Sequence, residues 1–242
     1  MELDTVVKGG YIDKIHCADC IDFMAQMPDE CIDLVVTSPP YNLGNNHHLR
    51  DRKLNVYPDD MPEDGYQRSQ LCLINECLRL LKPSGSIFYN HKNRIAKGKM
   101  ITPYQWLLLT EAVVKQEIVW YNGGCNFDKC RLYPMTERIY WLSKGIETQF
   151  RNTINKHDLW NYSAVGSGGI HQRAFPVKMI LDILDCFPEM LTVLDPYMGS
   201  GSTAIACIRS NRHYIGIELE QKYVDIANER IRQEQAQLKF NF

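Results

Sequence analysis

Short apolar runs alternate with amphipathic stretches along most of this chain, and the alternation predicts its elements. Apolar runs of four to six residues predict strands at 11–16, 32–36, 86–89, 117–121, 137–142, 191–194 and 213–217. Apolar residues at helical spacing predict helices at 21–27, 66–81, 106–114, 175–187, 203–210 and 221–235. Such alternation is typical of a doubly wound α/β domain. We therefore expect one domain over residues 1–242, with a mostly parallel sheet covered by helices on both faces.

Three stretches lack this periodicity and are expected to be loops: 43–64, 122–135 and 145–170. Pro83, Ser84 and Gly85 are expected to end the helix at 66–81. Long loops in compact domains usually carry function, and ligands of parallel sheets bind where the strands end. Several polar segments that follow predicted strands are therefore expected on one rim of the sheet, namely Asp19, 37–42, 199–201 and Glu218.

The segment Thr-Ser-Pro-Pro-Tyr-Asn at residues 37–42 follows a predicted buried strand. Its two prolines stiffen the backbone and lack N–H groups, so their carbonyls remain as acceptors with a fixed direction. Ser38 adds a hydroxyl and Tyr41 adds a flat ring. A rigid set of acceptors beside a ring suits a planar group that carries an amine, such as a nucleobase. A plain turn at the end of a strand, with a packed tyrosine, is the alternative at this point.

A second segment, LTVLDPYMGSGST at residues 191–203, joins a predicted strand to a predicted helix. Gly199 and Gly201 let a ligand approach the backbone, and the start of the helix has free N–H groups. Glu218 ends the next predicted strand, 17 positions after Gly201. An acidic residue there can accept hydrogen bonds from ribose hydroxyls. The pattern Gly-x-Gly-x-x-Ala also fits the dinucleotide fingerprint, which is weak evidence on its own.

Together the two segments resemble the (D/N/S)PP(Y/F) catalytic motif and the FxGxG-like cofactor motif of the DNA amino-methyltransferases, with Tyr197 in place of the usual Phe. The catalytic motif comes first, as in the β group of that family and unlike the release-factor and ribosomal-RNA methyltransferases. The resemblance implies a Rossmann-like methyltransferase fold with a circularly permuted motif order, and S-adenosylmethionine as the cofactor. It implies a catalytic set of Ser38, Pro39, Pro40 and Tyr41. In this set Ser38 Oγ and the Pro39 carbonyl accept the amino hydrogens of the target base, and Tyr41 stacks on that base.

The same resemblance assigns the cofactor contacts, which are Asp19, Phe175, Asp195, Tyr197, Gly199, Gly201, Thr203 and Glu218. Asp195 and the two glycines match the motif around the methionine part, and Glu218 matches the ribose-binding acid. Asp19 resembles an acidic residue near the adenosine, but a role as N-cap of the helix at 21–27 is an equal alternative. Phe175 lies in HQRAFP at 171–176, which resembles a further cofactor motif. A role at the start of a helix is its alternative.

The expected substrate is double-stranded DNA with the target base flipped out of the duplex. In the family SPPY accompanies cytosine N4 more often and DPPY accompanies adenine N6, so cytosine N4 is favoured and adenine N6 is the alternative. Target recognition is expected in an insertion at about 91–170. A homodimer and a cognate restriction endonuclease are further partners that the resemblance suggests. DNA contacts are predicted in and beside local basic patches, at Asn42, His47, Arg50, Arg52, Lys53, Lys92 and Arg94. The alternative is that these patches are solvated loops without a DNA contact.

The composition changes this picture little. The chain is 45% hydrophobic and carries a formal net charge of −2, so DNA binding must depend on local patches. No apolar run reaches membrane-spanning length and the first ten residues lack a signal-peptide pattern, so we expect a cytoplasmic protein without membrane contact. The nine cysteines are expected to be free thiols and no metal is expected. Zinc at Cys17 and Cys20 or at Cys125 and Cys130 is the alternative.

Two other classes of function compete with a DNA methyltransferase. A nicotinamide dehydrogenase would use the Gly-x-Gly-x-x-Ala pattern, but this pattern lies about 40 residues from the C-terminus and segment 37–42 would have no role. A DNA-binding module without catalysis disagrees with the intact Ser38, Pro39 and Tyr41. Cytosine C5 methylation is excluded, because its known enzymes resemble one another in a Pro-Cys nucleophile and none of the 11 prolines here precedes a cysteine.

Overall fold

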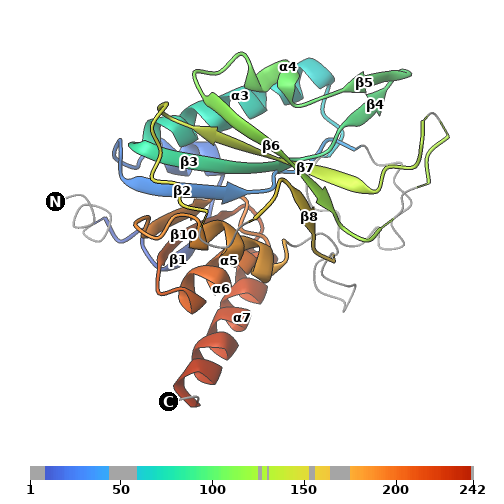
Figure 1. The fold of residues 1–242 in the computed structure, drawn as a ribbon. Coiled ribbons are helices and arrows are strands. Elements are labelled where there is room, and N and C mark those ends of the chain that lie inside the picture. The colour runs from blue at the N-terminus through green and yellow to red at the C-terminus, as the bar shows by residue number, and fades with distance from the viewer. Residues whose placement is uncertain are drawn as a thin grey trace.

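A central sheet with helices on both faces carries the two motifs (Figure 1). The computed structural model describes residues 9–43, 59–124, 127–129, 131–152, 156–163 and 175–240. The strands are β1 (Lys14–Cys17), β2 (Ile32–Thr37), β3 (Leu81–His91), β4 (Arg94–Ala96), β5 (Lys99–Ile101), β6 (Val113–Tyr121), β7 (Thr136–Ser143), β8 (Leu159–Asn161), β9 (Thr192–Asp195) and β10 (His213–Glu218). The helices are α2 (Cys20–Met24), α3 (Glu63–Leu80), α4 (Tyr104–Leu107), α5 (Val177–Asp185), α6 (Ser202–Arg209) and α7 (Gln221–Phe240).

Within these described ranges, eight strands form one sheet in the order β1-β10-β9-β2-β3-β7-β6-β8. The strands from β1 to β3 in this order are all parallel. β7 runs antiparallel to both of its neighbours, β3 and β6, and β8 pairs with β6 in parallel. β7 is therefore the one reversed strand among the eight. The predicted α/β fold with a mostly parallel sheet is confirmed.

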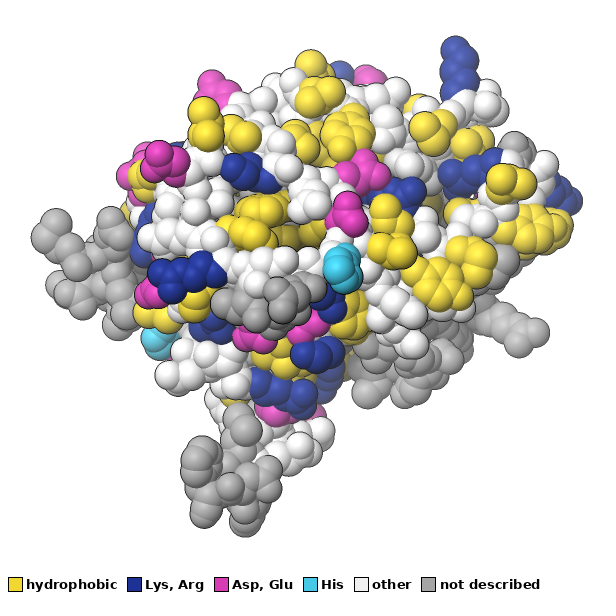
Figure 2. All heavy atoms as spheres, viewed as in Figure 1, with side chains coloured by type: hydrophobic (Ala, Val, Ile, Leu, Met, Phe, Trp, Pro, Cys, Tyr) yellow, Lys and Arg dark blue, Asp and Glu magenta, His cyan; other side chains and the backbone are white. Residues whose placement is uncertain are grey.

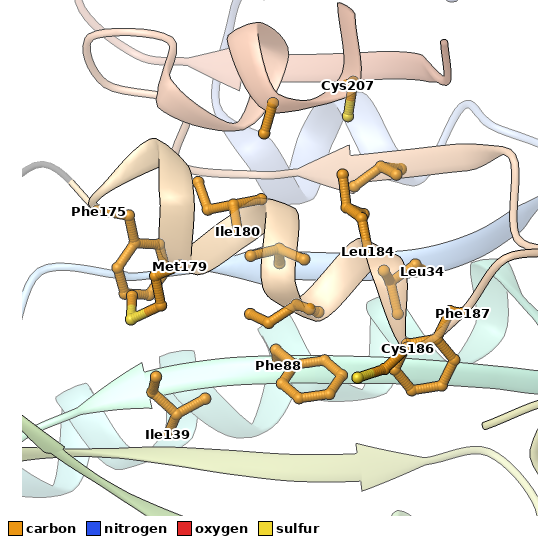
Figure 3. Close-up of a cluster of buried hydrophobic side chains, with 14 of the residues drawn as sticks. Leu34, Phe88, Ile139, Phe175, Met179, Ile180, Leu184, Cys186, Phe187 and Cys207 are labelled. Carbon is orange, nitrogen blue, oxygen red and sulfur yellow. The ribbon is translucent and has the colours of Figure 1, made fainter. Parts of the chain in front are cut away.

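Apolar side chains leave the sheet alternately toward two cores, because successive residues of a strand point to opposite faces. On β2, Val35 packs in the core shared with α2, α3 and α4, whereas Leu34 and Val36 pack in the core shared with α5 and α6. Figure 3 shows the second core, where Ile180 and Leu184 of α5 lie over the sheet. Burial on both faces explains why these strands appear in the sequence as continuous apolar runs.

Two predicted elements differ because strand pairing outweighs local periodicity. The helix predicted at 106–114 is reduced to α4, since Val113 and Val114 join β6 instead. These β-branched residues lose side-chain freedom in a helix and suit a pleated sheet. Pro83–Gly85, predicted to end a helix, lie inside β3, opposite an irregularity in the register of β2.

The sequence analysis did not anticipate hairpin β4–β5 or strand β8. Lys97 and Gly98 turn the hairpin with φ values of 50° and 74°, as the common two-residue hairpin turn requires. Trp160 anchors β8 and is 5% exposed. Within the region 91–170, where the insertion is expected, β6 and β7 belong to the main sheet. Of the helices in the described ranges, none combines the length and apolar character that spanning a membrane requires.

Candidate active site

The two motifs meet at the edge of the sheet where the parallel strands end. Segment 37–42 continues from β2, and the glycine loop continues from β9, the strand paired with β2. Thr37 Oγ1 donates a hydrogen bond to Asp195 Oδ1 at 3.1 Å, which joins the last residue of β2 to the last residue of β9. Glu218 ends β10 and Asp19 follows β1, the strand paired with β10. The common rim expected from the sequence is therefore present.

Asp195 is the centre of this junction. Its Oδ1 also accepts the N–H of Tyr197 at 3.1 Å, and its Oδ2 accepts the Thr203 hydroxyl at 2.6 Å. Asp195 is 4% exposed, and burial raises the pKa of its carboxyl to about 6 although hydrogen bonds from Thr203, Tyr197 and Thr37 favour the charged form. Thr203 and Tyr197, both predicted to contact the cofactor, thus help to shape the loop around Asp195.

The loop between β9 and α6 requires glycine at two positions. Gly199 has a φ of 52° and Gly201 a φ of 85°, in the left-handed region that favours glycine. A Cβ on Gly201 would lie 3.0 Å from Cβ of Ala227 in α7, so the helix leaves no space for a side chain. The Gly199 N–H donates to Glu218 Oε2 at 2.9 Å. The loop is therefore fixed against both β10 and α7.

This loop has the features of a site for a polar cofactor. Glu218 is 2% exposed, and its Oε1 accepts the N–H of Glu220 at 3.0 Å. A carboxylate has about four acceptor positions, so Glu218 retains capacity for ribose hydroxyls. Ser202 begins α6, and its buried hydroxyl lacks a hydrogen-bond partner among the residues that the structure describes. Buried polar groups are normally paired, so this hydroxyl at a helix start fits a site that a bound polar group completes.

Asp19 and Phe175 take structural roles in this conformation. Asp19 caps α2, because its Oδ1 accepts the N–H groups of Ile21 at 2.8 Å and Asp22 at 3.2 Å. Phe175 is buried directly before Pro176, the residue at the start of α5. The helix-cap and helix-start alternatives are thus both observed. Cofactor contact at these two residues stays a prediction, and the preceding residues 171–174 lie outside the described residues.

Ser38 and Tyr41 belong to a polar cluster with two residues from other strands, Asn90 and Glu137. Ser38 Oγ lies 2.8 Å from Tyr41 Oη and 3.1 Å from Asn90 Oδ1. Tyr41 Oη also contacts Asn90 Oδ1, and it lies 3.0 Å from Glu137 Oε2. Lys92 Nζ lies 2.8 Å from Glu137 Oε1 and balances its charge. The catalytic motif is thus anchored to β3 and β7.

The two hydroxyl protons of this cluster have one arrangement that serves both acceptors. Asn90 Oδ1 and the Glu137 carboxylate only accept hydrogen bonds. With Tyr41 donating to Glu137 and Ser38 donating to Asn90, each of these two acceptors receives one hydroxyl proton. Ser38 Oγ then keeps its lone pairs for a ligand. This is the state that an acceptor of amino hydrogens needs.

The sequence analysis missed Asn90 and Glu137, and also Tyr66 and His91, which lie behind the motif. A signal existed for Asn90 and His91, because they are polar residues at the carboxyl end of a buried strand, where ligand sites of parallel sheets lie. Glu137 lies near the start of β7, and the antiparallel pairing of β7 with β3 brings it to the same edge. Periodicity alone does not reveal that pairing.

Three of the residues predicted to contact DNA are described. Asn42 follows the motif with a φ of 54°, and its amide donates to the carbonyl oxygen of Met61 at 2.9 Å. Lys92 pairs with Glu137 beside Tyr41. Four further predicted DNA contacts lie outside the described residues, namely His47, Arg50, Arg52 and Lys53.

Arg94 forms an ion pair inside the protein in this conformation. It is 5% exposed, and its two terminal nitrogens each lie 2.8 Å from an oxygen of Glu63. Because Arg94 is buried, loss of Glu63, whose side chain is 32% exposed, would leave the charge of Arg94 uncompensated. A DNA phosphate would have to displace Glu63 from Arg94, so the DNA contact stays a prediction that requires this ion pair to open.

No group of three His, Cys, Asp or Glu side chains in the described ranges is arranged to hold a metal ion. Cys17 is exposed and Cys20 is buried as free thiols. Burial raises the pKa of Cys20 to about 11, and a protonated thiol is a poor metal ligand. Cys125 and Cys130 lie outside the described residues.

A polar motif and a glycine loop follow adjacent strands at one rim of the sheet, which is the arrangement expected of a methyltransferase fold. Residues 32–229 match the family model for DNA methylases of the N6/N4 type. The chain therefore belongs to the DNA methylase family. The resemblance seen in the two motifs is confirmed.

Comparison with individual proteins agrees with this assignment. The type II methyltransferase M.BglII from Bacillus subtilis is 29% identical over 256 residues, which cover 90% of this chain and 68% of the relative. The structure of the PvuII DNA methyltransferase, described as cytosine-N4-specific, has a TM-score of 0.74 at 19% identity and covers 91% of this chain and 90% of its own. The M1.HpyAVI–SAM complex has a TM-score of 0.61 at 22% identity and covers 90% and 98%. The fold and S-adenosylmethionine as the methyl donor of this family are confirmed.

The buried carboxyl of Asp195 should make stability depend on pH. Because its folded-state pKa is raised from 3.8 to about 6, the folded protein binds this proton more tightly, and the contribution of Asp195 to stability falls as the pH rises between these values. The full change is on the order of 3 kcal/mol. Urea unfolding should show the wild type losing stability relative to Asp195→Asn over this interval. A constant difference between the two proteins would contradict the buried charge.

Proposed function

We propose that this protein transfers the methyl group of S-adenosylmethionine to the N4 amine of cytosine in double-stranded DNA. The observation that carries the proposal is Ser38, a neutral acceptor in the first motif position, whose proton is engaged by Asn90. The likeness in fold to the PvuII enzyme, described as cytosine-N4-specific, supports the same base. Adenine N6 is the alternative within the family.

The chemistry of an exocyclic amine explains the motif. The amino nitrogen of cytosine is a poor nucleophile, because its lone pair is delocalised into the ring. Ser38 Oγ and the Pro39 carbonyl each accept one amino hydrogen, which favours a pyramidal nitrogen with its lone pair outside the ring plane. S-adenosylmethionine supplies an electrophilic methyl group on a sulfonium sulfur. The methyl group would replace one amino hydrogen, which would leave to solvent as a proton. The rate comes from alignment of nitrogen and methyl carbon, so the protein needs no covalent intermediate.

The carboxyl ends of β9 and β10 provide the cofactor contacts in this proposal. Glu218 accepts hydrogen bonds from ribose hydroxyls, and the Ser202 hydroxyl gains a partner. Gly199 and Gly201 hold the loop in a conformation that other residues rarely adopt. Asp195 fixes the shape of the loop, and its bond to Thr37 connects that loop with the catalytic motif.

Tyr41 is the proposed stacking partner of the flipped base. Its hydroxyl is anchored by Glu137, which restrains the ring. The ring centroid lies 5.0 Å from that of His91, and Lys92 Nζ lies 5.7 Å from the Tyr41 ring centroid. Lys92 therefore covers Tyr41 in this conformation. In our proposal it moves from Glu137 toward a DNA phosphate when the base enters.

Two projections beside the site are the proposed target-recognition elements. Hairpin β4–β5 is a two-stranded ribbon with Lys97 and Lys99, and such ribbons fit the major groove of DNA. The loop between β6 and β7 carries Phe127 and Leu132, which are 72% and 94% exposed, together with Arg131. In Figure 2, hydrophobic and basic side chains lie next to one another on the right of the view, where the hairpin and this loop project in Figure 1. Within the region expected at about 91–170, we therefore assign target recognition to these two projections.

The partners in this proposal follow from the family's substrate. Double-stranded DNA is the substrate, and the basic residues at 47–53 add phosphate contacts. A cytoplasmic location, a homodimer and a cognate restriction endonuclease complete the proposal, because type II methyltransferases are among the relatives.

Nucleoside analysis tests which amine is methylated. Unmodified DNA is treated with the purified protein and S-adenosylmethionine, digested to nucleosides and examined by mass spectrometry, in parallel with DNA from expressing cells. We expect N4-methylcytosine. N6-methyladenine alone would overturn the choice of base and leave the mechanism standing. 5-Methylcytosine would overturn the mechanism, since that product requires a nucleophile that the site lacks.

The stacking role of Tyr41 predicts a separation between turnover and cofactor binding. Tyr41→Ala should lower the single-turnover rate by about 5- to 150-fold, because stacking of a base on an aromatic ring contributes about 1–3 kcal/mol. Tyr41→Phe, which keeps the ring, should retain more of the rate. The dissociation constant of S-adenosylmethionine, measured by calorimetry, should stay within about threefold in both variants. Equal losses of rate and cofactor affinity in Tyr41→Ala would indicate a structural role instead.

A further inference from the structure

A buried chain of hydrogen bonds lies behind the catalytic motif and ends on the carbonyl oxygen of Pro40. Tyr66 Oη lies 2.7 Å from that oxygen and 2.6 Å from Nε2 of His91. Tyr66 is 3% exposed and His91 is fully buried. Nδ1 of His91 faces the backbone of Lys92, at 2.9 Å from the nitrogen and 2.8 Å from the oxygen. The mechanism above gives Tyr66 and His91 no role.

The protons in this chain can be placed by counting hydrogen bonds. With the imidazole proton on Nε2, His91 donates to Tyr66, Tyr66 donates to Pro40, and the Lys92 N–H donates to Nδ1, which gives three bonds. With the proton on Nδ1, His91 donates to the Lys92 oxygen and accepts the Tyr66 proton, which gives two. Buried polar groups are nearly always paired, so we assign the first tautomer. In that tautomer Pro40 receives the Tyr66 proton.

The surroundings hold this chain in one state. Burial lowers the pKa of His91 to about 3, so the imidazole is neutral near pH 7. The Tyr66 ring meets Trp106 edge-on at 5.9 Å, and the Arg94 guanidinium lies 4.8 Å from its centroid. Arg94 is itself fixed by Glu63. Because Tyr66 and His91 are neutral and closely packed, we expect their hydrogen bonds to keep this orientation when a substrate binds.

Fixing the Pro40 oxygen also fixes the neighbouring acceptor. The ring of Pro40 locks its φ, and the hydrogen bond to its carbonyl restrains its ψ, so the two peptide planes that flank Pro40 keep a defined mutual orientation. The plane before Pro40 contains the Pro39 carbonyl, which accepts an amino hydrogen in the proposed mechanism. The same bond occupies the Pro40 oxygen, so this competing acceptor is engaged before the base arrives.

We infer that Tyr66, supported by His91, is a positioning residue for methyl transfer, which aims the Pro39 carbonyl at the target amine without touching base or cofactor. The inference rests on the proposed role of Pro39 and is independent of which base is methylated. Loss of the Tyr66 hydroxyl should therefore slow the chemical step and leave cofactor affinity intact.

Tyr66→Phe removes the hydroxyl and keeps the ring, and Tyr89→Phe is its matched control. Tyr89 is a buried tyrosine of the same core, but its hydroxyl donates to Gln70 at 2.9 Å, accepts from Trp106 Nε1 at 3.3 Å, and has no hydrogen bond to the motif among the described residues. Each protein is measured for single-turnover transfer of labelled methyl from S-adenosylmethionine to unmodified DNA, for the dissociation constant of S-adenosylmethionine, and for melting temperature.

We expect Tyr66→Phe to lower the single-turnover rate by about tenfold or more, because small displacements of a reacting geometry have large effects on rate. The dissociation constant of Tyr66→Phe for S-adenosylmethionine should stay within about twofold of the wild-type value. The single-turnover rate of Tyr89→Phe should also stay within about twofold of the wild-type rate. Equal rate losses in the two variants would show a general effect of a lost buried hydroxyl and overturn the inference. A Tyr66→Phe rate within about twofold of wild type would overturn it as well.

Substitutions of His91 keep the test decisive if Tyr66→Phe does not fold. His91→Leu removes the donor to Tyr66, whereas His91→Gln can place an amide N–H near the position of Nε2. We expect His91→Leu to lower the rate about tenfold and His91→Gln to recover most of that loss. Equal rates in these two variants would overturn the inference. N6-methyladenine as the wild-type product would overturn only the cytosine assignment, because the rate ratios do not depend on the base.

Discussion

The structure depends most on the hydrogen bonds that Asp195 accepts from Thr37, Tyr197 and Thr203. Thr37 belongs to the catalytic motif and Thr203 to the helix after the glycine loop, so one buried carboxyl connects the two halves of the site. Segments separated by 158 positions in the sequence are joined by this contact. Burial raises the pKa of Asp195, and the three donors offset part of the cost of burying its charge.

The second layer of the site lies on the other side of the catalytic motif. Asn90 and Glu137 hold the hydroxyls of Ser38 and Tyr41, while Tyr66 holds the Pro40 carbonyl. The acceptors of the motif are thus oriented by residues of β3, β7 and α3 before any ligand binds. Such preorganisation is what alignment of a weak nucleophile with a methyl donor requires.

Most of the fold follows from periodicity, because strands buried on both faces give continuous apolar runs that are easy to recognise. The errors occur where the pattern is short or ambiguous. Val113 and Val114 extend a helical pattern, yet their branched side chains and the pairing with β7 place them in β6. Strand β8 and both strands of hairpin β4–β5 have three residues each, so none of them produces a usable run. The reversed direction of β7 depends on tertiary pairing, which local patterns do not encode.

The candidate site was predictable where its residues adjoin one another in sequence and belong to a motif. Asp195 and Glu218 end β9 and β10, and Gly199 and Gly201 lie in the loop that follows β9. Glu137 and Tyr66 reach the site only through the strand order and the packing of α3, so no spacing in the sequence indicates them. Arg94 lies in a basic stretch, which suggests DNA, and no sequence pattern indicates that it is buried and paired with Glu63.

The central claim is that Asp195 makes the catalytic motif and the cofactor loop one unit. The most direct measurement is the dissociation constant of S-adenosylmethionine for Thr37→Val, determined by calorimetry, since Thr37 lies in the catalytic motif and its hydroxyl donates to Asp195. Loss of a hydrogen bond worth about 1 kcal/mol predicts an affinity about fivefold weaker, with the protein still folded. A dissociation constant equal to that of the wild type would contradict the coupling of the two motifs through Asp195.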